Sequence, residues 1–73
     1  MTKQDIFESI PNGAEKIFAC NNTDIESLSD FQKTVKLIHD LASDGVITIV
    51  GEPYRENTTG YSFVSLIRAR KLI

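Results

Sequence analysis

The stretch LIHDLASDGVI, residues 37–47, decides the predicted fold because its hydrophobic period changes at Gly45. Before this glycine, Leu37, Ile38 and Leu41 recur at the spacing of one face of an α-helix. Glycine commonly ends a helix because it adopts the left-handed conformation without steric cost. After Gly45, valine and isoleucine open a β-branched run that is typical of a strand. The sequence therefore predicts a helix that passes directly into a β-strand.

Apolar spacing and start signals predict further helices ahead of that glycine. Residues 23–26 have the spacing of a capping box, and residues 29–32 repeat it six positions later, which places a tight turn between two helices. The last helix buries Thr34, Leu37, Ile38 and Leu41. The expected helices cover Thr2–Ile10, Ala14–Cys20, Thr23–Leu28 and Phe31–Ser43.

Two runs after Gly45 predict an antiparallel hairpin. Val46–Val50 is rich in β-branched residues, and Tyr61–Arg68 follows it across the polar loop Tyr54–Thr59. The alternation of apolar and polar residues slips at Val64–Leu66. That slip predicts a β-bulge, or a strand that is buried on both faces.

Length and composition bound the class of protein. With 73 residues, 41% hydrophobic and 25% charged, the chain is expected to form one domain over residues 1–73. A domain of this size buries only about 60% of its unfolded surface. Its core is therefore thin, and we expect a homodimer in which the apolar end Leu72-Ile73 packs on a second copy.

Several functional classes find no support in the sequence. Cys20 is the single cysteine, so neither an internal disulfide nor a cysteine zinc site can form, and we expect a buried, inert thiol. No nucleophile has a partnered base, and the four glycines are isolated, so we expect neither an enzyme nor a cofactor. Residues 1–5 lack the apolar run of a signal peptide, and no apolar stretch approaches the length of a membrane span, so the expected location is the cytoplasm with no membrane partner.

The order of the expected elements resembles a winged helix-turn-helix domain. Residues 37–47 carry the resemblance, which is specific over Phe31–Val50 and assigns no particular family. The resemblance implies an α+β, mostly α fold of three to four helices followed by a two-stranded antiparallel β-hairpin, the wing. The residues leave open whether Ala14–Cys20 or Thr23–Leu28 is the second helix of the motif.

The resemblance also implies a function, which is binding double-stranded DNA as a small transcriptional regulator or a phage or plasmid accessory protein. The helix of residues 31–44 would enter the major groove, and the wing would reach the backbone or the minor groove. Six of the eight basic residues fall in these two elements, so we expect an acidic back and a mildly basic front. The implied DNA contacts are Gln32, Lys33, Val35, Lys36, His39, Arg55, Asn57, Arg68, Arg70 and Lys71.

A second hypothesis is a protein-protein interaction module, a dimerisation domain without DNA binding. The net charge of −2 and the acidic residues Glu52 and Glu56 in the expected wing favour it, because phosphate repels carboxylates. On this hypothesis Lys33, Lys36 and His39 form an ordinary solvated helix face. Its expected signature is an exposed apolar patch formed by Phe63, Val64, Leu66, Leu72 and Ile73.

Overall fold

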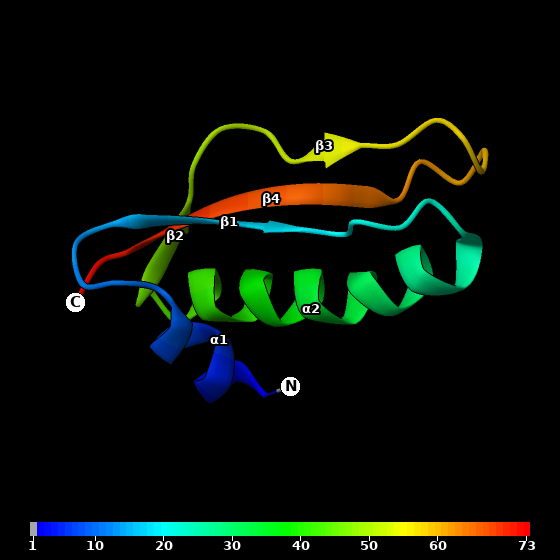
Figure 1. Cartoon of the computed structure of the whole chain (residues 1–73). Coiled ribbons are helices and arrows are strands. Elements are labelled where there is room, and N and C mark those ends of the chain that lie inside the picture. The colour runs from blue at the N-terminus through cyan, green and yellow to red at the C-terminus, as the bar shows by residue number, and fades with distance from the viewer. Residues whose placement is uncertain (1) are drawn as a thin grey trace.

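The computed structural model describes residues 2–73, and within them two helices lie on one side of a four-stranded antiparallel sheet (Figure 1). The elements are α1 (Lys3–Ser9), β1 (Glu15–Ala19), α2 (Ile25–Ser43), β2 (Ile47–Ile49), β3 (Tyr54–Arg55) and β4 (Val64–Lys71). Helix α2 runs along one face of the sheet, and α1 lies against α2 on the side away from the strands. No helix of residues 2–73 covers the opposite face of the sheet.

The predicted winged-helix fold is wrong in its elements. The expected helix Ala14–Cys20 is strand β1, whose residues alternate in exposure as a strand with one covered face does. Its backbone pairs with β4, and this pairing outweighs the marginal stability of a seven-residue helix. The protein is thus α+β with two helices and four strands within residues 2–73.

The turn predicted near residue 29 is also wrong, because α2 is continuous from Ile25 to Ser43. Asp24 supplies the N-cap, and its carboxylate accepts a hydrogen bond from Ser27 N at 2.9 Å. The second start signal therefore falls inside the helix and is not used. An unbroken helix brings Leu28, Val35 and Ile38 onto one buried face, which a turn would divide.

Two other local predictions are confirmed: the helix expected at Thr2–Ile10 is present as α1, and Gly45 follows the end of α2. Thr2 caps α1, with its hydroxyl accepting from Asp5 N at 3.1 Å and the Asp5 carboxylate accepting from Thr2 N at 3.0 Å. Helix α2 ends at Ser43, and Gly45 follows with a φ of 81°. The structure therefore keeps the helix-to-strand transition that residues 37–47 predicted.

The sheet is organised around β4, which pairs with β1 along one edge and with β2 and β3 along the other. The predicted two-stranded wing is wrong: β2 does pair antiparallel with β4, but its partners are Ala69–Lys71, beyond the expected run Tyr61–Arg68, and β1 and β3 pair with β4 as well. The register between β3 and β4 shifts at Tyr54/Arg55, opposite Val64–Leu66, which agrees with the bulge, one of the two structures predicted there.

The core lies between α2, α1 and the covered face of the sheet. Both helices and two strands contribute large aliphatic side chains to it, which is why neither layer is expected to fold alone. Its buried residues are Ile6, Ile10, Val35, Ile38, Leu41, Ile47, Val64, Ile67 and Ala69.

Candidate interaction surface

The face of the sheet opposite α2 is the candidate site. Ile67 and Ala69 are buried toward α2, so the alternating residues of β4 point the other way. The register with β1, β2 and β3 then fixes the neighbours on that face. We call this surface the open face; it comprises Glu15, Ile17, Ala19, Thr48, Tyr54, Leu66, Arg68, Arg70 and Leu72.

The centre of the open face is polar. Glu15 of β1 lies opposite Arg70 in the register, and its carboxylate accepts a hydrogen bond from the Arg70 guanidinium. Arg68 Nε lies 3.8 Å from the other carboxylate oxygen of Glu15. One carboxylate thus faces two guanidinium groups, so the cluster has a single net positive charge.

Three large apolar side chains surround this cluster. On the open face, Ile17 is 49% exposed, Tyr54 66% and Leu72 52%. Leu72 continues the β4 row, because its N–H donates to Val46 O at 3.0 Å. Isolated exposed apolar residues are ordinary on protein surfaces, and the presence of three on one uncovered face makes this face the candidate for an interaction.

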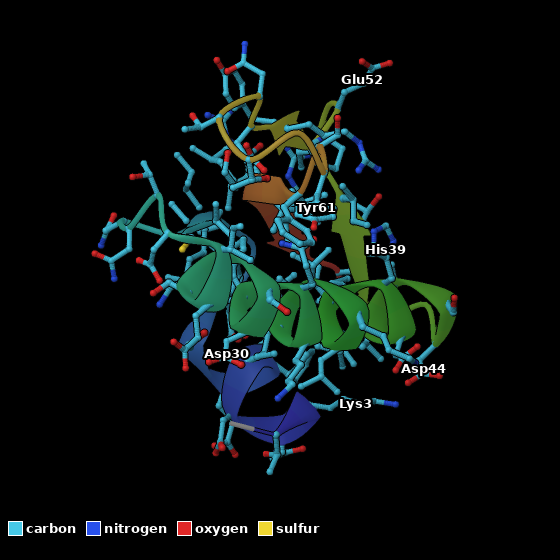
Figure 2. The ribbon with its side chains drawn as sticks, turned by 90° about the vertical axis from the view of Figure 1, so that its right-hand side faces the viewer. Lys3, Asp30, His39, Asp44, Glu52 and Tyr61 are labelled. Atoms are coloured by element: carbon cyan, nitrogen blue, oxygen red, sulfur yellow. The ribbon has the colours of Figure 1, made fainter. Side chains whose placement is uncertain are left out.

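Charge differs between the two layers. The helical part, residues 2–9 and 24–44, has three basic and seven acidic residues and a net charge of −4. The remaining residues of the chain have five basic and three acidic residues and a net charge of +2. Figure 2 shows the layers end on, with Lys3 and Asp30 on the helical side and Glu52 on the side of the strands. The predicted polarity is therefore present, but α2 belongs to the acidic side.

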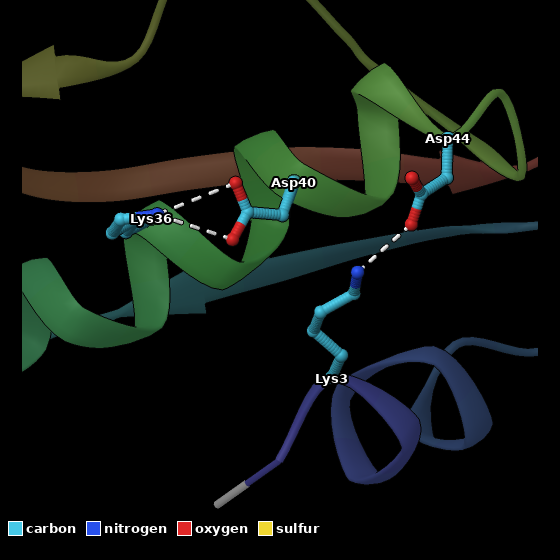
Figure 3. Close-up of polar contacts among 4 residues, drawn as sticks. All are labelled: Lys3, Lys36, Asp40 and Asp44. Atoms are coloured by element: carbon cyan, nitrogen blue, oxygen red, sulfur yellow. Dashed lines mark hydrogen bonds and ion pairs between the residues drawn. The ribbon is translucent and has the colours of Figure 1, made fainter.

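The lysines of the helical layer are paired with neighbouring carboxylates (Figure 3). Lys36 lies 3.3 Å from Asp40, and Lys3 of α1 lies 2.9 Å from Asp44 at the end of α2. The hydrogen bond from Lys3 to Asp44 raises the lysine pKa. Lys33 lies 3.5 Å from Asp30. These pairs are exposed and are expected to contribute little to stability, but they lower the positive potential of α2.

Two predicted DNA contacts on α2 point toward the sheet. Val35 is 6% exposed and belongs to the core, which corrects the expectation that it lies on an outer face. The Gln32 amide is occupied: Nε2 donates to Val64 O at 2.8 Å and to Leu28 O at 2.9 Å, and Oε1 accepts from Val64 N at 3.1 Å. Gln32 therefore joins α2 to β4 and has no free pair of groups to read a base.

The remaining predicted residues do not form one surface. His39, Lys33 and Lys36 are exposed on α2, whereas Arg68 and Arg70 lie on the open face. Arg55 donates to Ser62 O at 2.9 Å, and Asn57 is exposed in the loop after β3. Lys71 is buried on the covered side of the sheet, where its Nζ lies 4.1 Å from the centroid of the Phe7 ring. The ten residues thus divide among α2, the open face, β3 and the loop after it, and the core.

A small cavity of about 280 Å³ opens beside the β3–β4 loop. Glu56 is the charged residue of its lining, and its carboxylate already accepts hydrogen bonds from the β3–β4 loop. The donors are Thr58 N at 2.7 Å, Thr59 N at 3.0 Å, Phe63 N at 3.3 Å and the Thr59 hydroxyl. These hydrogen bonds lower the Glu56 pKa, with the Thr59 hydroxyl as the largest cause. The cavity is lined by Cys20, Asn22, Thr23, Leu28, Tyr54, Glu56, Asn57, Thr58 and Ser65.

Other kinds of site lack the necessary residues. Cys20 is half-buried, and its thiol donates to Asn22 O at 3.3 Å. Across residues 2–73, no three histidine, cysteine or acidic side chains gather closely enough to bind a metal ion. In the same range, neither helix combines the length and the apolar character needed to cross a bilayer.

No protein-family model, curated protein or solved structure matches this chain. The signal for the open face was available in the sequence as the alternation of Arg68 and Arg70 with Ala69 and Lys71, but it needs β1 beside it to define a face.

Proposed function

We propose that this chain is a protein-interaction module that self-associates through the sheet side of the molecule. The observation that carries the proposal is the presence of Ile17, Tyr54 and Leu72, all about half exposed or more, on one uncovered sheet face. Burying apolar surface of this kind yields about 25 cal/mol per Å². A 73-residue chain with a thin core gains stability from such a contact, which favours a second copy as the partner.

The charge distribution supports self-association over DNA binding by the helix. The helical layer has a net charge of −4, and Lys33 and Lys36 already face carboxylates. Affinity for DNA depends on unneutralised basic groups that displace counterions from phosphates. A cytoplasmic location belongs to the same proposal, because a single unpaired cysteine is typical of a reducing compartment.

The test is sedimentation equilibrium of the purified chain from about 5 to 500 µM, the range in which a small interface forms and dissociates. We expect the weight-average mass to rise from monomer toward dimer. Leu72→Ser is expected to weaken the dimer about tenfold. Ile25→Ser is the matched control, because Ile25 is also 52% exposed but lies in the first turn of α2. A monomer over the whole range contradicts the proposal.

A second candidate function is nucleic-acid binding by the open face, which the adjacent Arg68 and Arg70 and the exposed Tyr54 ring favour. Guanidinium groups contact phosphates, and aromatic rings stack on unpaired bases. Fluorescence titration with a single-stranded oligonucleotide and a mixed duplex at low salt separates the two functions. Binding that is lost in Arg68→Ala and Arg70→Ala supports the second function. Self-association without such binding supports the first.

A further inference from the structure

The outer edge of β1 presents backbone groups that no strand of residues 2–73 pairs. Cys20 N donates to Ser65 O at 2.9 Å, and Lys71 N donates to Ala14 O at 3.3 Å. These bonds fix the phase of the β1–β4 ladder, in which every second residue of β1 bonds to β4. The backbone N–H and C=O groups of Glu15, Ile17 and Ala19 therefore point away from β4, toward the free edge.

We propose that a second copy of this chain pairs with that edge, β1 against β1, antiparallel and centred on Ile17. The inference rests on the proposed self-association and adds an edge contact to it, in which Ile17 takes part whereas Tyr54 and Leu72 stay on the joined open face. With Ile17 opposite Ile17 of the partner subunit, each Glu15 faces Ala19 of the partner subunit. All three outward-pointing residues of each strand then find partners, giving six backbone hydrogen bonds. If the pairing is centred on Lys16 or on Phe18 instead of Ile17, only two of the three outward-pointing residues of each strand find partners.

The side chains fit the same register. Lys16 lies opposite Phe18 of the partner subunit, on the side of the sheet that α2 covers. Lys16 Nζ already lies 5.5 Å from the centroid of its own Phe18 ring, so the partner adds a second aromatic ring to an existing contact. A register centred on Lys16 would place two lysines opposite each other, and like charges directly opposite destabilise a sheet.

In this pairing the two copies are related by a two-fold axis perpendicular to the sheet. Directly opposite residues of an antiparallel pair lie on the same face, so both open faces join into one surface and both helical layers lie on the other side. The half-exposed Ile17 side chains meet at the centre of that joined surface. Because β1 has only five residues, the interface is smaller than that of most stable complexes. We therefore expect a dimer that dissociates at micromolar concentrations.

Ala19→Pro tests the pairing at the backbone. Proline removes the Ala19 N–H, which points to the free edge and makes no bond to β4, so β1 keeps its internal partners. We expect the dimer dissociation constant to rise about tenfold or more, measured by sedimentation equilibrium. Ala19→Val keeps the N–H and is expected to stay within about twofold of the wild type. Circular dichroism and a thermal melt verify that both variants fold.

Hydrogen exchange supplies a second measurement. The amides of Glu15, Ile17 and Ala19 are expected to exchange more slowly as the wild-type concentration rises through the dimerisation range. A folded Ala19→Pro that dimerises like the wild type, or edge amides that exchange at one rate throughout, overturns the edge pairing. If Leu72→Ser weakens the dimer in that same experiment, self-association through the open face stands while the edge geometry fails. A wild type that stays monomeric at about 500 µM overturns both.

Discussion

Gln32 offers the sharpest test of the architecture, because one side-chain amide takes the place of a missing strand. Strand β1 ends at Ala19, and the backbone of Val64 at the start of β4 pairs instead with both ends of the Gln32 amide, at 2.8 and 3.1 Å. Gln32→Met keeps the length of the side chain but removes both polar groups. The buried N–H and C=O groups of Val64 then lose their partners.

The expected loss follows from the cost of leaving buried backbone groups unsatisfied, about 1–3 kcal/mol each. The third bond, to Leu28 O, adds little because that carbonyl lies in a helical turn. We therefore expect Gln32→Met, which leaves two such groups unsatisfied, to lower the free energy of unfolding by about 2–6 kcal/mol in urea titrations. For a domain of this size, that loss lowers Tm by about 10 °C or more. Gln32→Glu keeps only the acceptor for Val64 N, so its free energy of unfolding should fall between those of wild type and Gln32→Met. If Gln32→Met lowers the free energy of unfolding by less than about 0.5 kcal/mol, the Gln32 amide does not replace a strand beside Val64, and Gln32 is an ordinary surface residue.

Two further predictions concern the loops. Glu56 has a pKa below its usual range because the Thr59 hydroxyl and three backbone N–H groups donate to it, so its stabilising effect is complete above the ordinary glutamate pKa and is lost as pH falls through the lowered value. The free energy of unfolding of wild type should therefore fall more steeply from pH 6 to 3 than that of Glu56→Gln. Glu52→Gln, which changes an exposed carboxylate, should follow wild type. Parallel curves for wild type and Glu56→Gln would contradict this role of Glu56. At Gly45, φ is 81° and an added Cβ meets nothing within 4 Å, so Gly45→Ala pays only for the backbone conformation. We expect Gly45→Ala to lower the free energy of unfolding by about 1 kcal/mol in thermal or urea unfolding, and Gly45→Asn to lower it less. If wild type and both variants are equally stable, the left-handed conformation of Gly45 is not what ends the helix.

The local signals in the sequence predicted the parts of the fold that depend on neighbouring residues. Helix α1 and the glycine that follows α2 were both expected, because helical spacing and a left-handed turn are set within a few positions. Strand β1 was predicted as a helix because its partner lies about fifty residues away, with Ile17 opposite Arg68. Five residues are too few for the hydrophobic period to distinguish the two structures.

The candidate site was predictable only in its composition. The basic residues Arg68 and Arg70 were singled out, but their position beside Glu15 depends on the β1–β4 register, which no spacing in the sequence encodes. Val35 was expected on an outer face because the apolar stripe was centred one side too far around the helix. The observed stripe includes Leu28, which the expected turn had assigned to a separate helix. The predicted binding face therefore loses Gln32 and Val35 to the sheet side of α2, whereas Lys33, Lys36 and His39 stay exposed as expected.

Glu15 lies on the edge strand β1 and partly neutralises the two arginines of the open face. A nucleic-acid surface requires its arginines to be free for phosphate, whereas here one carboxylate engages both Arg68 and Arg70. The same neutralisation favours contact between copies, because two open faces joined side by side through β1 each contribute one net positive charge instead of two. The acidic helical layer, which includes α2, lies on the opposite side of the sheet and does not oppose that contact. Charge and exposed apolar surface thus favour the same face, and the geometry supports a partner made of protein.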